Sequence, residues 1–419
     1  MKNIKLGIST SATQIESQDI SSNWHDWANI KGNIIDGTHP KDTTNHYNLY
    51  QKDSKLLKEL NISYYRMGIE WASIEPKENE YNETVIQHYI SEIKDLKENN
   101  IQVMVCFHHF TNPTWFENKG GWLKKDNNIY FIDFVKKMLS HLKDLVSEYL
   151  TFNEPSIYAG QSYFLGIWPP QHCSFNEYLM VISNMATCHL VIYKYIKLLY
   201  KGKHTLISFA HSYALVRAYK HSLSGNIVSK TYSYFTNKIV LNAFMKGKFS
   251  LFLKNHNKIK KEQYTDFIAL NYYAINFFKG TKPKNPSNYP LTDMDWLVYP
   301  EGIVICLKEM LKIMKLPVFI TENGICDNKD AFRIRYIFEH LKALQDSKLV
   351  IERYYHWCFI DNFEWNSGLQ KQFGLIKMDN YKERIIKKSG YFYSLLTQRE
   401  LDDKKILEMV KDSNYIRFS

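Results

Sequence analysis

The stretch that decides the fold is EYLTFNEP, residues 148–155, in which an apolar run ends in an asparagine, a glutamate and a proline. The run from Glu148 to Phe152 has the length and the nearly continuous apolar character of a strand in a parallel sheet covered by helices. A carboxylate directly after such a strand lies at the sheet edge where parallel folds bind ligands. Glu154 is therefore either a functional acid or only the polar end of a buried strand.

Seven further apolar runs of strand length occur along the chain. They are Lys5 to Ser9, Ser63 to Ile69, Ile101 to Phe107, His204 to Phe209, Asp266 to Leu270, Pro317 to Thr321 and Tyr354 to Phe359. Helical patterns, in which apolar residues return every three or four positions, separate most of them and are clearest at 47–60, 84–99, 131–146 and 331–345. Eight such units predict an α/β fold, a closed (β/α)₈ TIM barrel formed by residues 1–419 as one domain.

A doubly wound open sheet is the alternative architecture. It requires a glycine-rich phosphate turn after the first strand, and Gly7 stands alone in LGISTSAT. We therefore expect the barrel, with the active site at the C-terminal ends of its strands.

Composition and charge limit the classes of partner. The formal charge of +11 arises from 54 Lys and Arg against 43 Asp and Glu, but no block of five or six like charges occurs, so we expect a solvated surface and no nucleic-acid partner. The six cysteines are widely spaced without a CxxC pair, which favours reduced thiols. The N-terminal residues lack an apolar signal region and no run of 18 apolar residues occurs, so we expect no membrane partner and a cytoplasmic location.

Polar and aromatic residues close the predicted strands, where a barrel binds its substrates. They are Gln14, Arg66, His108, His109, Asn153, Glu154, Asn271, Tyr273, Glu322, Trp357, Glu364 and Trp365. Two glutamates with amides and tryptophans suit sugar chemistry, because glycoside cleavage needs one carboxylic acid for the leaving oxygen and a second carboxylate on the opposite side of the sugar. Glu154 and Glu322 form the natural pair, since the fourth and seventh strands of a closed barrel face each other across its mouth.

The environments of the two glutamates must separate their pKa values. Burial or a neighbouring negative charge raises the pKa of an acid, whereas a cation keeps a nucleophile ionised, and Arg66 is the available cation. Tyr273 can donate a hydrogen bond to the same carboxylate. Amide side chains suit sugar hydroxyls, and indole faces cover the apolar face of a pyranose.

We expect neither a metal nor another cofactor. His108 and His109 are adjacent and point in opposite directions at a strand end, and no further ligands at metal spacing accompany them. A hydrogen bond from one of them to the substrate is the favoured interpretation.

Seven motifs occur in the expected order and together resemble glycoside hydrolase family 1, the retaining β-glycosidases that include β-glucosidases; the resemblance extends from about residue 5 to residue 380. They are ATQIE (12–16), YRMGIEW (65–71), HHFTNPTWF (108–116), TFNEP (151–155), DFIALNYY (266–273), FITENG (319–324) and DNFEW (361–365). The resemblance implies hydrolysis of β-glucosides or β-galactosides by double displacement, with Glu322 as nucleophile and Glu154 as acid/base.

The resemblance also assigns the remaining candidates. It implies that Gln14, His109, Asn153, Glu364 and Trp365 hold the hydroxyls of the non-reducing sugar, with Asn153 on the 2-hydroxyl. It implies that Arg66, Asn271 and Tyr273 position and tune the nucleophile. Trp357 matches the platform under the sugar, followed in this family by a cis peptide, here at 357–358.

Some residues depart from the family pattern, namely Met67, Gly68, His356 and Gln372, so the acceptor preference stays open.

A 6-phospho-β-glycosidase is an alternative that Lys371 favours, but Glu364 would repel a phosphate and Phe373 replaces the expected phosphate-binding tyrosine. A transglycosylase on the same fold is another. A non-catalytic sugar-binding barrel protein is the alternative of a different class, although this chain keeps both glutamates. The sugar, the aglycone and the oligomeric state are not determined by the sequence.

Overall fold

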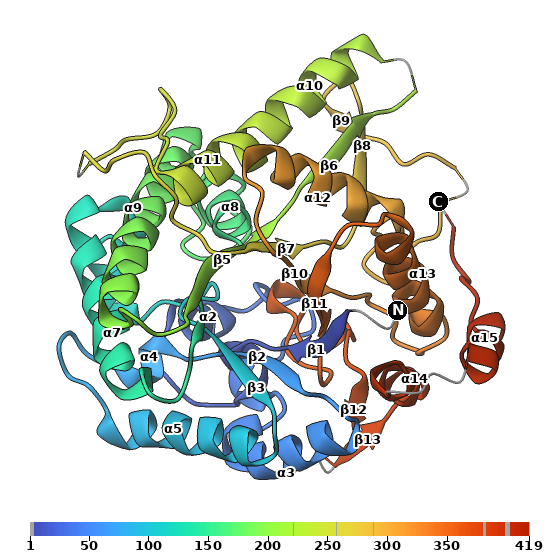
Figure 1. Cartoon of the computed structure of the whole chain (residues 1–419). Helices are drawn as coiled ribbons and strands as arrows, with labels where there is room; N and C mark the ends of the chain where they lie inside the picture. The colour runs from blue at the N-terminus through green and yellow to red at the C-terminus, as the bar shows by residue number, and fades with distance from the viewer. Residues whose placement is uncertain are drawn as a thin grey trace.

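The computed structural model describes residues 4–220, 222–256, 258–287, 289–379, 383–398 and 403–418 (Figure 1). Its centre is a closed barrel of parallel strands in the order β1-β11-β10-β7-β5-β4-β3-β2, which confirms the predicted (β/α)₈ fold. The barrel strands are β1 (Lys5–Ser9), β2 (Tyr64–Gly68), β3 (Gln102–Cys106), β4 (Glu148–Asn153), β5 (Leu206–Ser212), β7 (Ile268–Asn271), β10 (Val318–Asn323) and β11 (Ile351–Trp357). Each overlaps a predicted run; the last begins and ends a few residues earlier than expected.

Helices surround the barrel (Figure 1). The longer ones are α3 (His46–Glu59), α5 (Glu83–Glu98), α7 (Asn128–Leu142), α9 (Phe175–Leu199), α10 (Leu223–Ser233), α11 (Ile239–Lys246), α12 (Glu301–Ile313), α13 (Arg333–Asp346), α14 (Lys388–Thr397) and α15 (Asp403–Lys411). The four clearest helical patterns correspond to α3, α5, α7 and α13. In α5 the apolar residues return every three or four positions and are buried, and Asn82 caps the first turn by accepting from the backbone amides of Thr84 and Val85.

Short elements fill the connections. They are α1 (Ala12–Ile15), α2 (Asn23–Ala28), η1 (Pro40–Asp42), α4 (Trp71–Ile74), α6 (Thr114–Asn118), η2 (Gly121–Leu123), η3 (Lys125–Asn127), α8 (Pro155–Ala159) and η6 (Trp365–Ser367), with π-helical turns at η4 (Gly160–Phe164) and η5 (Tyr234–Lys238). A three-stranded sheet joins β6 (Leu215–Ala218), β8 (Ile275–Lys279) and β9 (Lys282–Pro283), and a hairpin joins β12 (Ile376–Met378) and β13 (Arg384–Ile386).

The barrel interior is packed at its base and polar at its mouth. Inward side chains of several strands form a small apolar cluster that includes Leu150, Phe267 and Phe319. Below it, at the N-terminal end of the strands, Arg353 Nη2 of β11 donates to Glu148 Oε1 of β4 across 2.6 Å. The interior is therefore a filled core, and only the C-terminal ends of the strands leave room for a ligand.

Helix α9 is the one helix in the described residues that is long and apolar enough to cross a membrane by length and composition. It lies in the helical layer, and 72% of its most apolar window is buried within the protein. Burial on this scale is typical of a core helix. The expected absence of a membrane partner and the cytoplasmic location stay predictions.

Candidate active site

A cavity of about 460 Å³ opens at the C-terminal ends of the strands. Eight of the predicted residues line it: His109, Asn153, Glu154, Tyr273, Glu322, Trp357, Glu364 and Trp365. Of the other four, Gln14, Arg66 and Asn271 are fully buried and hydrogen-bond to lining residues. The fourth, His108, does not line the cavity and is buried with its Nε2 3.0 Å from Asn112 Oδ1. The structure thus brings together side chains that are up to 351 positions apart in the sequence.

Glu322 is held through both carboxylate oxygens. Arg66 Nη1, from β2, donates to Oε1 across 2.5 Å, and Tyr273 Oη, just after β7, donates to Oε2 across 2.6 Å. The Arg66 guanidinium is completely buried, so its charge acts at short range with little screening by water. This geometry matches the cation and the phenol expected beside a nucleophile.

Glu154 has a different environment. It follows β4 in the left-handed region, at φ 45°, and α8 begins directly after it with Pro155 at its first position. Proline suits that position because its missing N–H would have no helical partner. Asn271 Nδ2 donates to Glu154 Oε1 across 2.8 Å, and no cation contacts this carboxyl among the described ion pairs.

Burial raises the pKa of both carboxyl groups, and their neighbours act in opposite directions. At Glu154 the negative charge of Glu322 adds to the effect of burial, and the pKa rises to about 8. At Glu322 burial also raises the pKa, but Arg66 and Tyr273 oppose the rise by favouring the ionised form. When the pair shares one proton near neutral pH, these contacts favour the proton on Glu154.

Asn153 connects the two carboxyl groups. Its Oδ1 accepts from Arg66 Nη2 at 2.7 Å and from Asn271 Nδ2 at 3.0 Å. These donors fix the amide orientation, so Nδ2 is the atom that lies 3.0 Å from Nε2 of His109. Because an amide nitrogen only donates, the imidazole accepts there and carries its proton on Nδ1. Burial lowers the pKa of His109 well below its usual value, which keeps the ring neutral.

Gln14 and Glu364 meet at another side of the cavity. Gln14 Nε2 donates to the Phe363 carbonyl at 2.8 Å and lies 3.4 Å from Glu364 Oε2. Burial, with the charge of Glu322, raises the pKa of Glu364 to about 8. An amide and a carboxyl side by side offer both donors and acceptors, as a sugar with several hydroxyls requires.

Aromatic rings line the rest of the cavity. Trp357 and Trp365 each stack on His109, with ring centroids 5.7 and 5.9 Å from it and interplanar angles of 25° and 23°. The peptide bond between Trp357 and Cys358 is cis, as the resemblance implied. Trp365 also packs on Trp24 at 4.7 Å, which fixes the indole from behind.

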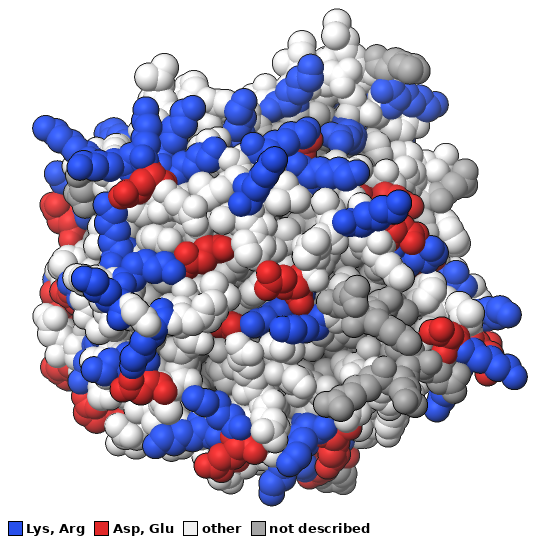
Figure 2. Space-filling model, viewed as in Figure 1, with Lys and Arg blue, Asp and Glu red and all other residues white. Residues whose placement is uncertain are grey.

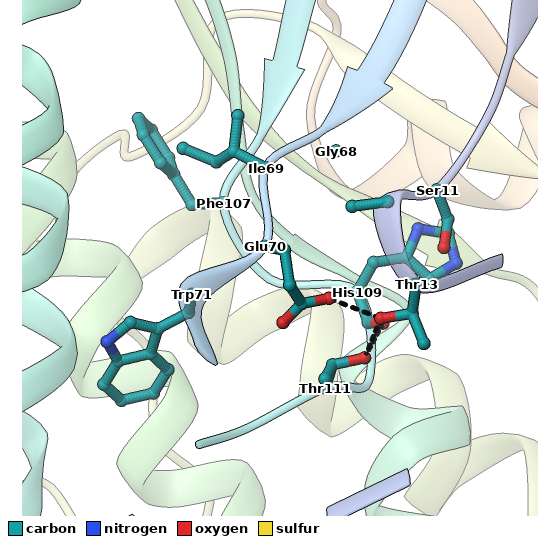
Figure 3. A pocket seen from close by; sticks show the side chains of 10 residues that line it. Ser11, Thr13, Gly68, Ile69, Glu70, Trp71, Phe107, His109 and Thr111 are labelled. Atoms are coloured by element: carbon teal, nitrogen blue, oxygen red, sulfur yellow. Dashed lines mark hydrogen bonds between the residues drawn. The ribbon is translucent and has the colours of Figure 1, made fainter. Parts of the chain in front are cut away.

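Behind His109 lies a small polar cavity of about 10 Å³ (Figure 3). Thr13 hydrogen-bonds to Glu70, and its hydroxyl lies 2.6 Å from that of Thr111. Burial raises the pKa of Glu70 to about 7. Sequence reasoning missed this supporting layer, although Thr13 and Glu70 fall inside two of the quoted motifs.

None of the residues that depart from the family pattern lines the cavity that holds Glu154 and Glu322, although Gly68 lines the small polar cavity behind His109. His356 is buried next to Tyr393, at 5.5 Å between ring centroids. The Gln372 carbonyl accepts from Arg333, and Lys371 Nζ donates to the Asp293 carbonyl across 2.5 Å. Gly68 packs against α1, where an added Cβ would come within 2.9 Å of the Ala12 nitrogen.

Sequence reasoning also missed the entrance of the cavity. Its lining there includes Gln161, Trp168, Tyr213, Tyr232 and Trp296, which come from loops and helices after different strands. No local pattern marks these positions, because loops of variable length deliver them. In the described residues no three side chains gather as a metal site, so the absence of a metal stays a prediction.

A closed barrel with paired glutamates, amides and indoles at its mouth defines the class of O-glycosyl hydrolases. The sequence profile of glycosyl hydrolase family 1 matches residues 2–401, and the chain belongs to this family. It is 29% identical to beta-glucosidase A of Acetivibrio thermocellus, over 94% of this chain and 96% of that protein. It is 27% identical to galactolipid galactosyltransferase SFR2 of Arabidopsis thaliana, over 86% of this chain and 59% of that protein. Among solved structures, the beta-glycosidase from Pyrococcus horikoshii matches with a TM-score of 0.87 and 28% identity, over 98% of this chain and 97% of that chain.

Proposed function

We propose that the protein is a retaining β-glycosidase that hydrolyses β-glucosides or β-galactosides, with Glu322 as nucleophile and Glu154 as acid/base. One observation carries the assignment: Arg66 and Tyr273 bind both oxygens of Glu322, whereas Glu154 is buried, makes no ion pair with any described residue, and has its pKa raised to about 8. The contacts of Glu322 favour an ionised carboxylate, and the environment of Glu154 favours a protonated acid.

Two displacements follow from these roles. In the first, a Glu322 oxygen bonds to the anomeric carbon while the bond to the aglycone oxygen breaks and that oxygen takes the proton of Glu154. In the second, the Glu154 carboxylate accepts a proton from water, the water oxygen bonds to the anomeric carbon, and Glu322 leaves. Each step inverts the anomeric centre, so the product keeps the β configuration.

The polar contacts support a sugar with free hydroxyls. Gln14 and Glu364 would bind the outer hydroxyls, Asn153 and His109 those nearer the anomeric carbon, and Trp357 the apolar face of the ring. A 6-phospho sugar is disfavoured, because the Glu364 carboxyl lines the cavity and would repel a phosphate. Lys371 Nζ, which could otherwise bind a phosphate, donates a hydrogen bond to the Asp293 carbonyl. Phe373, which has no polar group, lines the same cavity.

Glycosyl transfer is the second candidate, because a relative is named as a galactosyltransferase. Transfer shares the first displacement and differs only in whether water or another hydroxyl attacks the intermediate. The decisive experiment follows product stereochemistry by NMR on a panel of aryl β-glycosides, with and without an added alcohol acceptor. Initial release of the β anomer supports the proposal, initial release of the α anomer refutes the covalent role of Glu322, and predominant transfer in dilute acceptor assigns transglycosylation.

A further inference from the structure

The positive charge of the protein is concentrated in one segment. Residues 217–315 contain sixteen Lys and Arg against six Asp and Glu, a net charge of +10 out of the +11 of the whole chain. Figure 2 shows Lys and Arg side chains gathered over the upper part of the molecule, where α10, α11 and α12 lie in Figure 1, with few acidic side chains among them. No block of five or six like charges marks this segment, because its cations are interspersed with uncharged residues.

The few acids of the segment do not neutralise its lysines. Most of them pair with cations from elsewhere: Glu262 with Lys194, Asp266 with Lys197, and Asp293 and Asp295 with Arg417. Among the ion pairs between described residues, Lys312 is the one cation of the segment that binds a carboxylate, Glu309 at 2.6 Å. The remaining cations are available to an external anion.

Four of these unpaired cations, Arg217, Lys230, Lys238 and Lys246, line a groove of about 640 Å³, together with the Lys312–Glu309 pair. The groove lies beside the mouth of the active site. Tyr213 lines both, and α10 separates them, with Tyr232 on the active-site cavity and Lys230 on the groove. A ligand that covers the groove would therefore lie next to the substrate entrance.

Large apolar side chains project from the same surface. Helix α10 packs closely through Gly225, where a Cβ would meet the Phe278 carbonyl at 2.4 Å. Leu223, Ile227 and Lys230, at positions i, i+4 and i+7, form a stripe on its opposite side. Leu223 is 76% exposed and Ile227 61% exposed.

A second pair of exposed apolar residues adjoins the C-terminal end of α10. Leu251 is fully exposed and Phe252 is half-exposed. The Phe252 ring lies 6.3 Å from that of Tyr234, which lines the basic groove. Exposed aliphatic side chains among unpaired lysines are characteristic of surfaces that bind at a membrane interface.

We propose that this basic apolar face, formed by α10, η5, α11 and residues 248–254, docks on an anionic lipid bilayer. This proposal replaces the expectation of no membrane partner, which rested on the lack of a spanning run and not on the surface. Lysines attract anionic headgroups, and the apolar tips enter the boundary between headgroups and acyl chains. Nucleic acid would satisfy the cations but would leave Leu223, Ile227 and Leu251 against a polar phosphate backbone. Docking would place the mouth of the active site beside the bilayer, within reach of glycosides carried by lipids. The docking proposal does not depend on whether the protein is a glycosidase.

Co-sedimentation of the full chain with vesicles tests the proposal. We expect binding to vesicles of phosphatidylcholine mixed with phosphatidylserine, no binding to phosphatidylcholine alone, and weaker binding as salt is added. The triple variant Lys230→Glu, Lys238→Glu, Lys246→Glu and the double variant Leu223→Ser, Ile227→Ser should each lower the affinity by about tenfold or more. Thermal unfolding verifies that both variants fold.

A matched control variant separates the effect of the local charge on vesicle binding from the effect of the net charge of the protein. Lys55, Lys58 and Lys94 are exposed on α3 and α5 without a carboxylate partner among the described ion pairs, and their replacement by Glu changes the charge by the same amount. This variant should keep vesicle binding. The proposal is overturned if the protein does not bind anionic vesicles, if the control loses as much affinity as the first variant, or if Leu223→Ser, Ile227→Ser binds unchanged while duplex DNA displaces the vesicles.

Discussion

Tyr273 Oη donates a hydrogen bond of 2.6 Å to Glu322 Oε2 and so connects the end of β7 to the end of β10. The hydroxyl stabilises the ionised carboxylate, and it opposes the rise in pKa that burial causes at Glu322. The tuning of the proposed nucleophile therefore depends on one phenol as well as on Arg66.

Replacement Tyr273→Phe should raise the pKa of Glu322 and move the acidic limb of the pH profile of kcat/KM to higher pH. A hydrogen bond to a charged group contributes about 1.5–3 kcal/mol, so we expect a roughly 10- to 100-fold loss of kcat/KM at neutral pH. Tyr272→Phe is the matched control, because the Tyr272 hydroxyl donates to the Tyr299 carbonyl at 2.6 Å. An unchanged acidic limb in Tyr273→Phe would refute the tuning role.

Replacement Glu322→Ala should abolish hydrolysis of β-glycosides and make room for azide. In this variant azide would attack the anomeric carbon from the face that the Glu322 carboxylate attacks in the unmodified protein. Because only one displacement then occurs, the product would be the α-glycosyl azide. Glu154→Ala should instead yield the β-glycosyl azide, because Glu322 still forms the intermediate. NMR of the azide products distinguishes the two variants, and identical anomers from both would contradict the assignment of roles.

The basic limb of the pH profile should reflect Glu154. An acid donates only while it holds its proton, so activity on poor leaving groups should fall as the pH rises through about 8. In Glu154→Gln, kcat/KM for dinitrophenyl glycosides should be nearly preserved and lose this limb, because that leaving group needs no proton. A basic limb that persists in the variant would assign the titration to another group.

The sequence predicted the barrel because each strand is a local apolar run, and it predicted that the strand-end side chains lie together because they converge once the barrel closes; their roles stay predictions. The sequence thus placed Arg66, Asn271 and Glu322 in one site although no distance between them was known. The entrance residues Tyr232, on α10, and Trp296, in a loop, were not predicted, since their positions depend on how the long connections between barrel strands fold. Nor was the concentration of lysines over α10 to α12, because these lysines are interspersed with uncharged residues and form no block of five or six like charges.

The proposed sugar contact Glu364 should make the protein less stable at higher pH. Its pKa is about 8 in the folded protein against an ordinary value of 4.5, so between these values the folded state binds the additional proton. Stability from this group is complete below pH 4.5 and is lost as the pH rises through 8.

Glu364→Gln should therefore raise the thermal midpoint at pH 8 by roughly 2–4 °C and leave it nearly unchanged at pH 4.5. It should also raise KM, because the sugar contact is lost. Glu59→Gln, exposed on α3, is the control and should change neither midpoint. Calorimetry at both pH values measures the difference, and an equal shift at the two would show that Glu364 is not the titrating group.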